Sequence, residues 1–267
     1  MRNAEQNTQA KVTGAQSEQV QQEREWREQR HRQQCRRLTT LDLLSQYDTF
    51  RLLAHWCSFF DLLWADREME MIDWYHHYLK RHFSSENGDI ESAFVHFVAS
   101  QLRPRARVLE CGLGLGRSAA ALAGRGFFVL GADNDPNMLR LVRELHAELV
   151  TKGQMALLEV DILYLSRFFS RGSFDACTHT GVLEHYEKDQ RRLLLLEQLA
   201  VADHVLFSVP IDTPHTRAYF ERGPALRRDL RSPESWLSEL SETFDCLPGP
   251  VARQRTDNAF FFIRNSL

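Results

Sequence analysis

Short apolar runs alternate with helical segments from Arg107 to the end of the chain. The runs have the length and residue types of buried strands, and they are Arg107–Cys111, Phe127–Leu130, Met155–Val160, Phe174–Thr180, His204–Val209 and Phe260–Ile263. Helical patterns fill the intervals, at Ser118–Ala123, Pro136–Val150, Leu163–Phe169 and a long stretch that includes Leu193–Leu199. Strands separated by helices predict right-handed crossovers and a parallel sheet, with the last strand paired antiparallel.

Two segments of different composition precede this region. Residues 1–37 are rich in Gln, Arg and Glu, so we expect a disordered tail or a solvated helix. Residues 38–102 show helical periodicity with many aromatic side chains, which predicts a helical lid over a substrate site, although the same aromatics suit core packing. Within it, a turn ending at Asp89 precedes a further helix from Ile90. The third predicted domain is 103–267, which carries the ligand-binding sheet.

Composition narrows the class of protein. The chain has 267 residues, 43% of them hydrophobic, and a formal net charge of −3, which gives no strong nucleic-acid signal. Its five cysteines include no C-x-x-C pair, so we expect reduced thiols and no metal site. The beginning of the chain has no apolar signal region, and no run is long enough for a membrane span. We therefore expect a soluble cytoplasmic protein, with the oligomeric state left open.

A glycine loop follows the first predicted strand. Gly112, Gly114 and Gly116 alternate with leucines directly after Glu110 and Cys111. Glycines at such positions let the main chain approach a ligand with no Cβ in the way. The dinucleotide fingerprint requires a glycine where this chain has Arg117, and no Gly-Lys-Ser/Thr of a phosphate loop follows. The spacing favours a ligand without a pyrophosphate.

Acidic residues end the next two strands. Asp133 lies at the tip of the second strand, where a carboxylate can accept hydrogen bonds from both hydroxyls of a ribose. Asp135 precedes Pro136 and fits a helix cap better. Asp161 ends the third strand and can accept from an adenine amine, with Ile162 covering the ring, although a strand-end aspartate is equally typical of a cap. Together with Glu110, these acids predict a binding crevice at the carboxyl ends of the strands.

From Arg105 to Phe262 the chain resembles the class I methyltransferases that use S-adenosylmethionine (SAM). Glu110–Gly116 is similar to the family's first motif, Gly131-Ala132-Asp133 to its second, and Phe174-Asp175 with Gly181–His185 to its fourth-strand motif. The resemblance implies a three-layer α/β Rossmann-like sandwich with a seven-stranded, mostly parallel sheet whose last strand is antiparallel. It also implies SAM as cofactor and S-adenosylhomocysteine as product.

The resemblance assigns roles to residues of the crevice. Glu110 would meet the methionine amino group, and the three glycines would line the methionine and ribose. Asp133 would bind the ribose, and Asp161 with Ile162 the adenine. Asn134 and Thr180 complete the predicted cofactor-binding set.

Methyl transfer from a sulfonium requires mainly orientation, and a general base only for a weakly acidic acceptor. His185 and Glu184 follow the fourth strand and are the candidate catalytic residues, although His185 also suits a packing or capping role. His179, on the strand itself, is expected to be buried and hydrogen-bonded.

The sequence gives the methyl acceptor only by exclusion. No Asn/Asp-Pro-Pro-aromatic motif of enzymes that methylate nucleobase amines follows the fourth strand, so a small molecule is the first choice. The acceptor lid is expected from residues 47–83 and 211–231. Tyr219, Phe220 and Trp236 are candidates to wall an apolar acceptor. Three arginines, at 227, 228 and 231, are candidates to bind an anion or are simply solvated.

Three other functions stay open. A protein or RNA methyltransferase would be recruited through the Arg-rich residues 1–37. A SAM-binding regulatory protein would keep the ligand motifs without catalysis. An NAD-dependent oxidoreductase is the weakest, because the third fingerprint glycine is missing.

Overall fold

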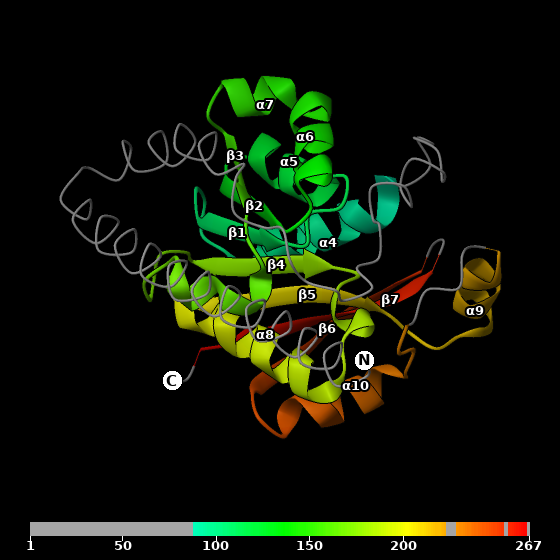
Figure 1. The fold of residues 1–267 in the computed structure, drawn as a ribbon. Coiled ribbons are helices and arrows are strands. Elements are labelled where there is room, and N and C mark those ends of the chain that lie inside the picture. The colour runs from blue at the N-terminus through cyan, green and yellow to red at the C-terminus, as the bar shows by residue number, and fades with distance from the viewer. Residues whose placement is uncertain (1–87, 223–227, 254–255, 266–267) are drawn as a thin grey trace, which may run out of the picture. The chain divides into compact units, whose positions relative to one another are not determined.

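A seven-stranded sheet is the centre of the structure. The computed structural model describes residues 88–222, 228–253 and 256–265. The strands are β1 (Arg107–Cys111), β2 (Phe128–Asp133), β3 (Met155–Glu159), β4 (Ala176–Thr180), β5 (His204–Pro210), β6 (Asp245–Arg253) and β7 (Asp257–Arg264). Their order across the sheet is β3-β2-β1-β4-β5-β7-β6, which Figure 1 shows from top to bottom. Neighbours from β3 to β5 pair in parallel, and β7 pairs antiparallel with both β5 and β6.

Helices cover both faces of this sheet. They are α4 (Gly88–Gln101), α5 (Arg117–Gly124), α6 (Pro136–Leu145), α7 (Ala147–Thr151), α8 (Lys188–Val201), α9 (Pro214–Glu221) and α10 (Pro233–Ser241), with short 3₁₀ helices η3 (Ile162–Arg167) and η4 (Leu183–His185). Buried residues of α4, α5 and α6 form one hydrophobic cluster with the sheet, and those of η3, α8 and α10 form another. The predicted three-layer Rossmann-like sandwich is confirmed.

Alternation along the strands produces the two clusters. Val108 of β1 belongs to the cluster under α4 and α5, and its neighbour Leu109 belongs to the one under α8. Likewise Phe260 of β7 faces α4, whereas Phe261 faces the opposite layer. Because successive strand residues point to opposite faces, a strand buried on both sides is apolar throughout. The apolar runs recognised in the sequence are therefore strands that are covered on both faces.

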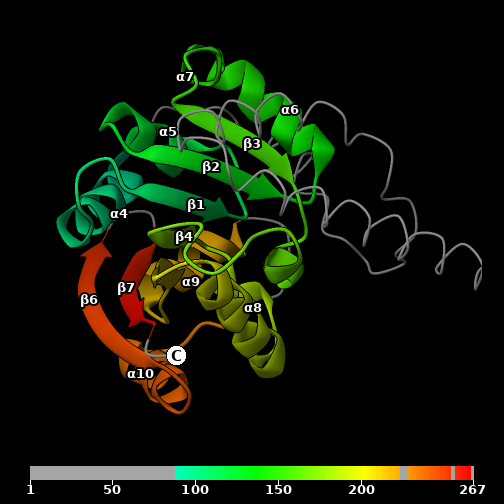
Figure 2. The same cartoon turned by 90° about the vertical axis from the view of Figure 1, so that its left-hand side faces the viewer.

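One strand was missed by the sequence analysis. Strand β6 lies at the edge of the sheet beside β7, as Figure 2 shows, and contains Pro248, Gly249 and Pro250. Prolines cannot donate to a strand ladder, and the register of β6 shifts between Pro248 and Val251. This proline-glycine segment resembles a turn in sequence, and it is tolerated here because an edge strand pairs on one side.

The described part of the predicted lid region belongs to the sandwich. Helix α4 begins at Gly88, two residues before the expected start, and buries Phe94, Val95 and Val98 against the sheet. Phe94 meets Phe260 edge to face, with ring centroids 5.5 Å apart. The predictions for residues 1–37 and for the aromatic segment 38–87 lie outside the described residues.

Sheet topology places a switch point at the carboxyl ends of β1 and β4. From β1 the chain adds β2 and then β3 on one side, and β4 and β5 on the other. The crossovers after β1 and β4 therefore leave toward opposite sides, and ligands of open α/β sheets bind at such a switch point. The glycine loop follows β1, and the segment Gly181–Tyr186 follows β4. Both therefore lie at the switch point, where the sequence analysis expected a binding crevice.

Candidate methyltransferase site

The glycine loop makes a tight turn between β1 and α5. Gly112, Gly114 and Gly116 have φ values of 69°, 50° and 68°, in the left-handed region that side chains disfavour. The Gly112 N–H donates to the Ala132 carbonyl of β2 at 2.9 Å, and the Gly116 N–H donates to the Leu113 carbonyl at 2.8 Å. These two hydrogen bonds fix the main-chain path of the loop.

Close contacts explain why Gly112 carries no side chain. A Cβ there would lie 2.8 Å from Cγ2 of Val182, in the segment after β4. That is shorter than carbon atoms tolerate, so the bare main chain lets the two crevice loops touch. The segment bearing the candidate catalytic residues therefore packs directly on the glycine loop.

Asp133 links the end of β2 to the glycine loop. Its Oδ2 accepts from the Leu113 N–H at 2.9 Å, and its Oδ1 accepts from the Asp135 N–H at 3.0 Å. The residue is 9% exposed, and burial raises the pKa of its carboxyl to about 6, against the lowering effect of these N–H groups. Each carboxylate oxygen can accept a second hydrogen bond, so the loop contacts leave room for a ligand hydroxyl.

Asp135 has the cap role that the sequence analysis gave it. Its side chain accepts from the N–H groups of Asn137 and Met138 at the start of α6, and Pro136 occupies the first helical position. Asn134, between the two aspartates, is exposed. The structure therefore separates the two acids into a crevice residue and a helix cap.

Glu110 is buried on β1, one position before Cys111, the last residue of the strand. It is 2% exposed, and the Thr178 hydroxyl on the neighbouring strand β4 donates to its Oε2. Thr180 lies two residues further along β4, on the same side of the strand, and is half-buried. The side chains of Glu110, Thr178 and Thr180 therefore follow two adjacent strands toward the crevice.

Asp161 begins the 3₁₀ helix after β3. Its Oδ1 accepts from the Leu163 N–H at 3.0 Å, so the capping role that the sequence left open is present. Ile162, the residue expected to cover an adenine ring, is 8% exposed and belongs to the hydrophobic cluster under α8. Its remaining exposed surface is small, and its contact with a cofactor stays a prediction.

Tyr186 is a crevice residue that the sequence analysis did not single out. It follows η4, packs against the cluster under α8, and has its pKa raised to about 12 by burial and by the Asp161 and Asp133 carboxylates. The charges of both acids therefore act on its hydroxyl. The available sequence signal was an aromatic residue directly after a Glu-His pair. No local pattern indicates that the acids at the ends of β2 and β3 act on it.

Glu184 and His185 form a close pair on η4. Oε1 of Glu184 lies 3.6 Å from Nε2 of His185, and the side chains are 3% and 10% exposed. Burial raises the pKa of Glu184 to about 7, and the Arg228 charge opposes that shift. Among the described residues, Oε2 of Glu184 has no hydrogen-bond partner. A buried carboxyl that titrates near neutral pH has the properties of a proton acceptor.

His179 is buried as predicted, but it is not hydrogen-bonded as predicted. It is fully buried on β4 and stacks on Phe207 of β5, with ring centroids 4.9 Å apart. Neither of its ring nitrogens has a hydrogen-bond partner in the part of the chain that the structure describes. Burial lowers its pKa to about 3, so the ring is neutral at physiological pH. The apolar surroundings explain the missing partners.

Two of the predicted acceptor contacts are wrong. Trp236 is fully buried in the cluster under α8 and α10, because α10 turns this side chain to the sheet. Arg231 is committed to ion pairs with Asp229 and Glu239. Tyr219 and Phe220 are half-buried on α9 and form an edge-to-face pair.

Of the two other arginines predicted to bind an anion, the structure describes Arg228. Arg228 lies over the Phe220 ring, 4.1 Å from its centroid, and its charge acts on Glu184. Arg227 lies outside the described residues. This part of the predicted acceptor lid therefore combines an aromatic ring with a cation.

Two further observations concern metals and membranes. Within residues 88–222, 228–253 and 256–265, no three His, Cys, Asp or Glu side chains are grouped to hold a metal ion. No helix in the same ranges has the length and apolar character needed to cross a bilayer. Cys111, Cys177 and Cys246 are buried free thiols.

Comparison with known proteins identifies the domain. Residues 108–202 match the family model described as a methyltransferase domain. A search of curated protein sequences returned no match.

Solved structures share the fold at low sequence identity. Magnesium protoporphyrin IX methyltransferase from Synechocystis PCC 6803, with bound S-adenosylhomocysteine, is 16% identical with a TM-score of 0.56, covering 82% of this chain and 94% of its own. The apo SAM-dependent methyltransferase SibL is 21% identical with a TM-score of 0.53, covering 64% and 53%. The 1,6-didemethyltoxoflavin N1-methyltransferase of Burkholderia thailandensis is 17% identical with a TM-score of 0.51, covering 67% and 79%. Residues 108–202 therefore match a methyltransferase domain, and the chain shares its fold with solved SAM-dependent methyltransferases, as the resemblance in the sequence predicts.

Proposed function

We propose that this protein transfers the methyl group of SAM to a small-molecule acceptor. The observation that carries the proposal is the glycine loop, which Asp133 fixes at the topological switch point through the Leu113 N–H. Around it, Glu110, Asp133 and Asp161 stand at the carboxyl ends of three adjacent strands. Three acids suit a cofactor that carries a sulfonium and an ammonium charge.

Each part of SAM has a proposed binding group. The ammonium of the methionine part would pair with Glu110, the ribose hydroxyls with Asp133 and Asn134, and the adenine with Asp161 and Ile162. Thr180 and Tyr186 would complete the wall contributed by β4 and its loop. The cofactor, when bound, supplies a methyl group already activated for displacement by its sulfonium.

The chain's own chemical contribution would come from η4. Val182 rests on Gly112, so Glu184 and His185 lie beside the loop that would hold the methyl donor. We assign to this pair the removal of a proton from the acceptor. His185 would accept the proton while Glu184, ionised above pH 7, holds the imidazole, or Glu184 would take the proton itself. The acceptor would enter from the side of Phe220 and Arg228.

Replacing the glycine that touches Val182 tests the loop. Gly112→Ala adds a Cβ at 2.8 Å from Val182, and we expect SAM affinity to fall about tenfold by calorimetry. The matched control is Gly153→Ala, because Gly153 has the same φ of 69° and a Cβ there meets nothing within 4 Å among the described residues. Both variants carry the left-handed strain of roughly 1–2 kcal/mol. Equal SAM affinities in the two variants would refute the role of the loop contact.

Glu184→Gln and His185→Ala test the proton-transfer pair. Each should lower methyl transfer about a hundredfold, the scale of general base catalysis, and leave SAM affinity unchanged. Because Glu184 has a pKa of about 7 and acts ionised, wild-type turnover should rise with pH up to about 7 and then level off. Glu184→Gln should abolish that rise. Turnover at the wild-type rate in both variants would remove the pair from the mechanism.

A labelled-methyl survey tests the acceptor class. The full chain is incubated with methyl-labelled SAM and with separated metabolite, protein and RNA fractions of a cell extract. Label in the metabolite fraction supports the proposal, as does the fold shared with enzymes whose names give a porphyrin and a toxoflavin precursor. Label in protein or RNA would favour the macromolecular alternative. Tight SAM binding without label in any fraction would favour a regulatory protein.

We further place the protein in the cytoplasm. The buried free thiols of Cys111, Cys177 and Cys246 support a reducing compartment.

A further inference from the structure

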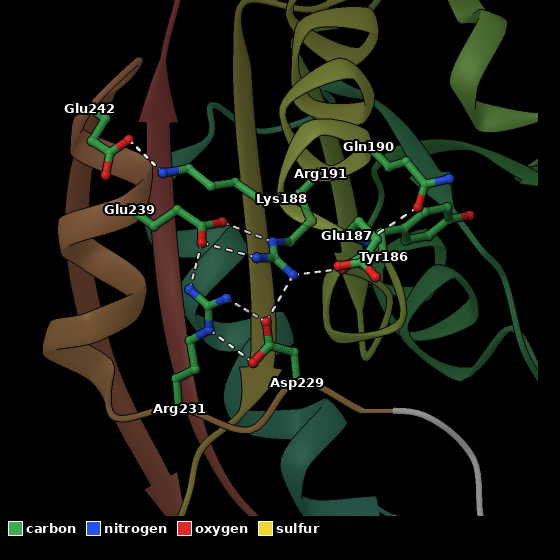
Figure 3. A network of polar contacts seen from close by, with 9 residues as sticks. All are labelled: Tyr186, Glu187, Lys188, Gln190, Arg191, Asp229, Arg231, Glu239 and Glu242. Atoms are coloured by element: carbon green, nitrogen blue, oxygen red, sulfur yellow. Dashed lines mark hydrogen bonds and ion pairs between the residues drawn. The ribbon is translucent and has the colours of Figure 1, made fainter.

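Two arginines and two acids form a closed ion-pair network beside the crevice, drawn in Figure 3. Arg191 of α8 donates from Nε and Nη2 to Glu239 of α10, at 2.8 and 2.9 Å, and from Nη1 to Asp229 at 3.0 Å. Arg231 donates to the same two carboxylates. Both guanidinium groups lie over the Trp236 ring, 5.1 and 5.2 Å from its centroid. The four charges therefore balance, two positive and two negative, beside one indole ring.

Arg191 is the buried member of this network. Its side chain is 2% exposed, compared with 27% for Arg231. Its three nitrogens contact Glu239, Asp229 and the main-chain carbonyl of Tyr186, which accepts from Nη1 at 2.6 Å. A planar fork can make these bonds in three directions, whereas an ammonium group cannot cover the same span.

The network holds η4 by its main chain at two points. Arg191 binds the Tyr186 carbonyl directly after η4, and the Asp229 N–H donates to the Glu184 carbonyl within it, at 2.8 Å. Asp229 is itself clamped by Arg191 and Arg231. The main-chain carbonyls of Glu184 and Tyr186 are therefore both held, one on each side of His185. Glu184 and His185 themselves belong to a 3₁₀ turn of three residues. A turn this short has little rigidity of its own.

We propose that Arg191 is a positioning residue, whose buried guanidinium fixes the η4 main chain and thereby sets the distance between Glu184 and His185. This inference rests on the proposed catalytic role of that pair, but the geometry that it predicts exists without cofactor or acceptor. Arg191 touches neither reacting group. It acts through the Tyr186 carbonyl and through Asp229.

The test compares Arg191→Lys with Arg231→Lys in the full chain. Both variants remove a guanidinium from the same two carboxylates, but Arg191 also donates to the Tyr186 carbonyl, whereas the Arg231 side chain binds Asp229 and Glu239. Arg231→Lys is therefore the matched control. The readout is the NMR titration of the His185 imidazole in the protein without cofactor. Glu184→Gln first gives the shift that follows when the neighbouring carboxylate is lost. Arg228, whose charge also acts on Glu184, is unchanged in every variant.

Arg191→Lys should displace the His185 titration in the direction of Glu184→Gln, by at least half of that shift. Arg231→Lys loosens Asp229 but keeps the bond to the Tyr186 carbonyl, so its displacement should be smaller than that of Arg191→Lys. A folded Arg191→Lys protein with the wild-type titration overturns the proposal, even if its thermal midpoint falls. If Arg191→Lys does not fold, Arg191→Gln replaces it: glutamine keeps a hydrogen-bond donor for Glu239 but has no guanidinium to reach the Tyr186 carbonyl, and an unchanged titration there overturns the proposal equally.

SAM calorimetry on the same variants separates the two claims. Wild-type protein that fails to bind SAM refutes the proposed function, while the His185 titration still reports on the geometry. Wild-type protein that binds SAM, with an Arg191→Lys titration identical to wild type, refutes the positioning role alone. Unchanged SAM affinity in Arg191→Lys, together with the displaced titration, places the effect on η4 and not on the glycine loop.

Discussion

Asp133→Ala should weaken SAM binding at least about tenfold. The change would leave ribose hydroxyls without a buried acceptor, which costs roughly 1–3 kcal/mol. It also removes the acceptor of the Leu113 N–H, so the glycine loop loses its tie to β2. Isothermal calorimetry on the folded variant measures the loss directly.

The control for Asp133→Ala is Asp135→Ser, two residues away. Serine keeps an oxygen that can cap the N–H groups of Asn137 and Met138, so SAM affinity should stay at the wild-type value. Since the pKa of Asp133 is about 6, wild-type affinity should also fall as the pH drops below 6, and Asp133→Ala should lose that dependence. A folded Asp133→Ala protein with unchanged affinity would contradict the assignment of the crevice.

The second large effect concerns stability in acid. His179 has a pKa of about 3 in the folded protein against an ordinary value of 6.5, so between these values the unfolded chain binds a proton that the folded chain does not. The stability present above pH 6.5 is therefore lost as the pH falls toward 3, at about 1.4 kcal/mol per pH unit. His179→Phe should not lose this stability. Between pH 7 and pH 4.5, its free energy of unfolding should fall by about 3 kcal/mol less than that of wild type.

Urea unfolding at pH 7 and pH 4.5 measures this difference. His179→Phe should also be as stable as wild type at pH 7 or more so, because it removes two buried nitrogens without partners among the described residues. Phe207→Leu serves as control: it removes the ring stacked on His179 and lowers stability, but it should keep the wild-type dependence on pH. Parallel pH profiles for wild type and His179→Phe would exclude His179 as the source.

The sheet and the binding crevice could be predicted from the sequence because each pattern that indicates them lies within a few consecutive residues. The run Arg107–Cys111 matches β1 at both ends, and the cap at Asp135 follows from the proline beside it. The glycine loop was found for the same reason: its spacing is contiguous in sequence. The position of this loop at the carboxyl end of β1 then follows from the fold class.

The features that the sequence analysis missed depend on contacts between residues far apart in the chain. Arg191 and Glu239 are 48 residues apart, and no local pattern indicates their ion pair. Trp236 was expected at an acceptor, but the burial of its ring depends on how α10 meets α8. The missing partners of His179 likewise depend on which strands flank β4. Strand β6 was missed because its prolines obscure the strand pattern, and its pairing with β7 compensates only in the folded chain.

The prolines of β6 have a consequence for self-association. An open sheet edge normally offers a row of N–H and C=O groups on which a second chain can add a strand. Pro248 and Pro250 have no N–H, and the register shift between Pro248 and Val251 interrupts the remaining row. The outer side of β6 is therefore a poor template for a continuous sheet between two copies, and the exposed apolar side chains of Leu247 and Val251 can stand there with less danger of amyloid-like stacking.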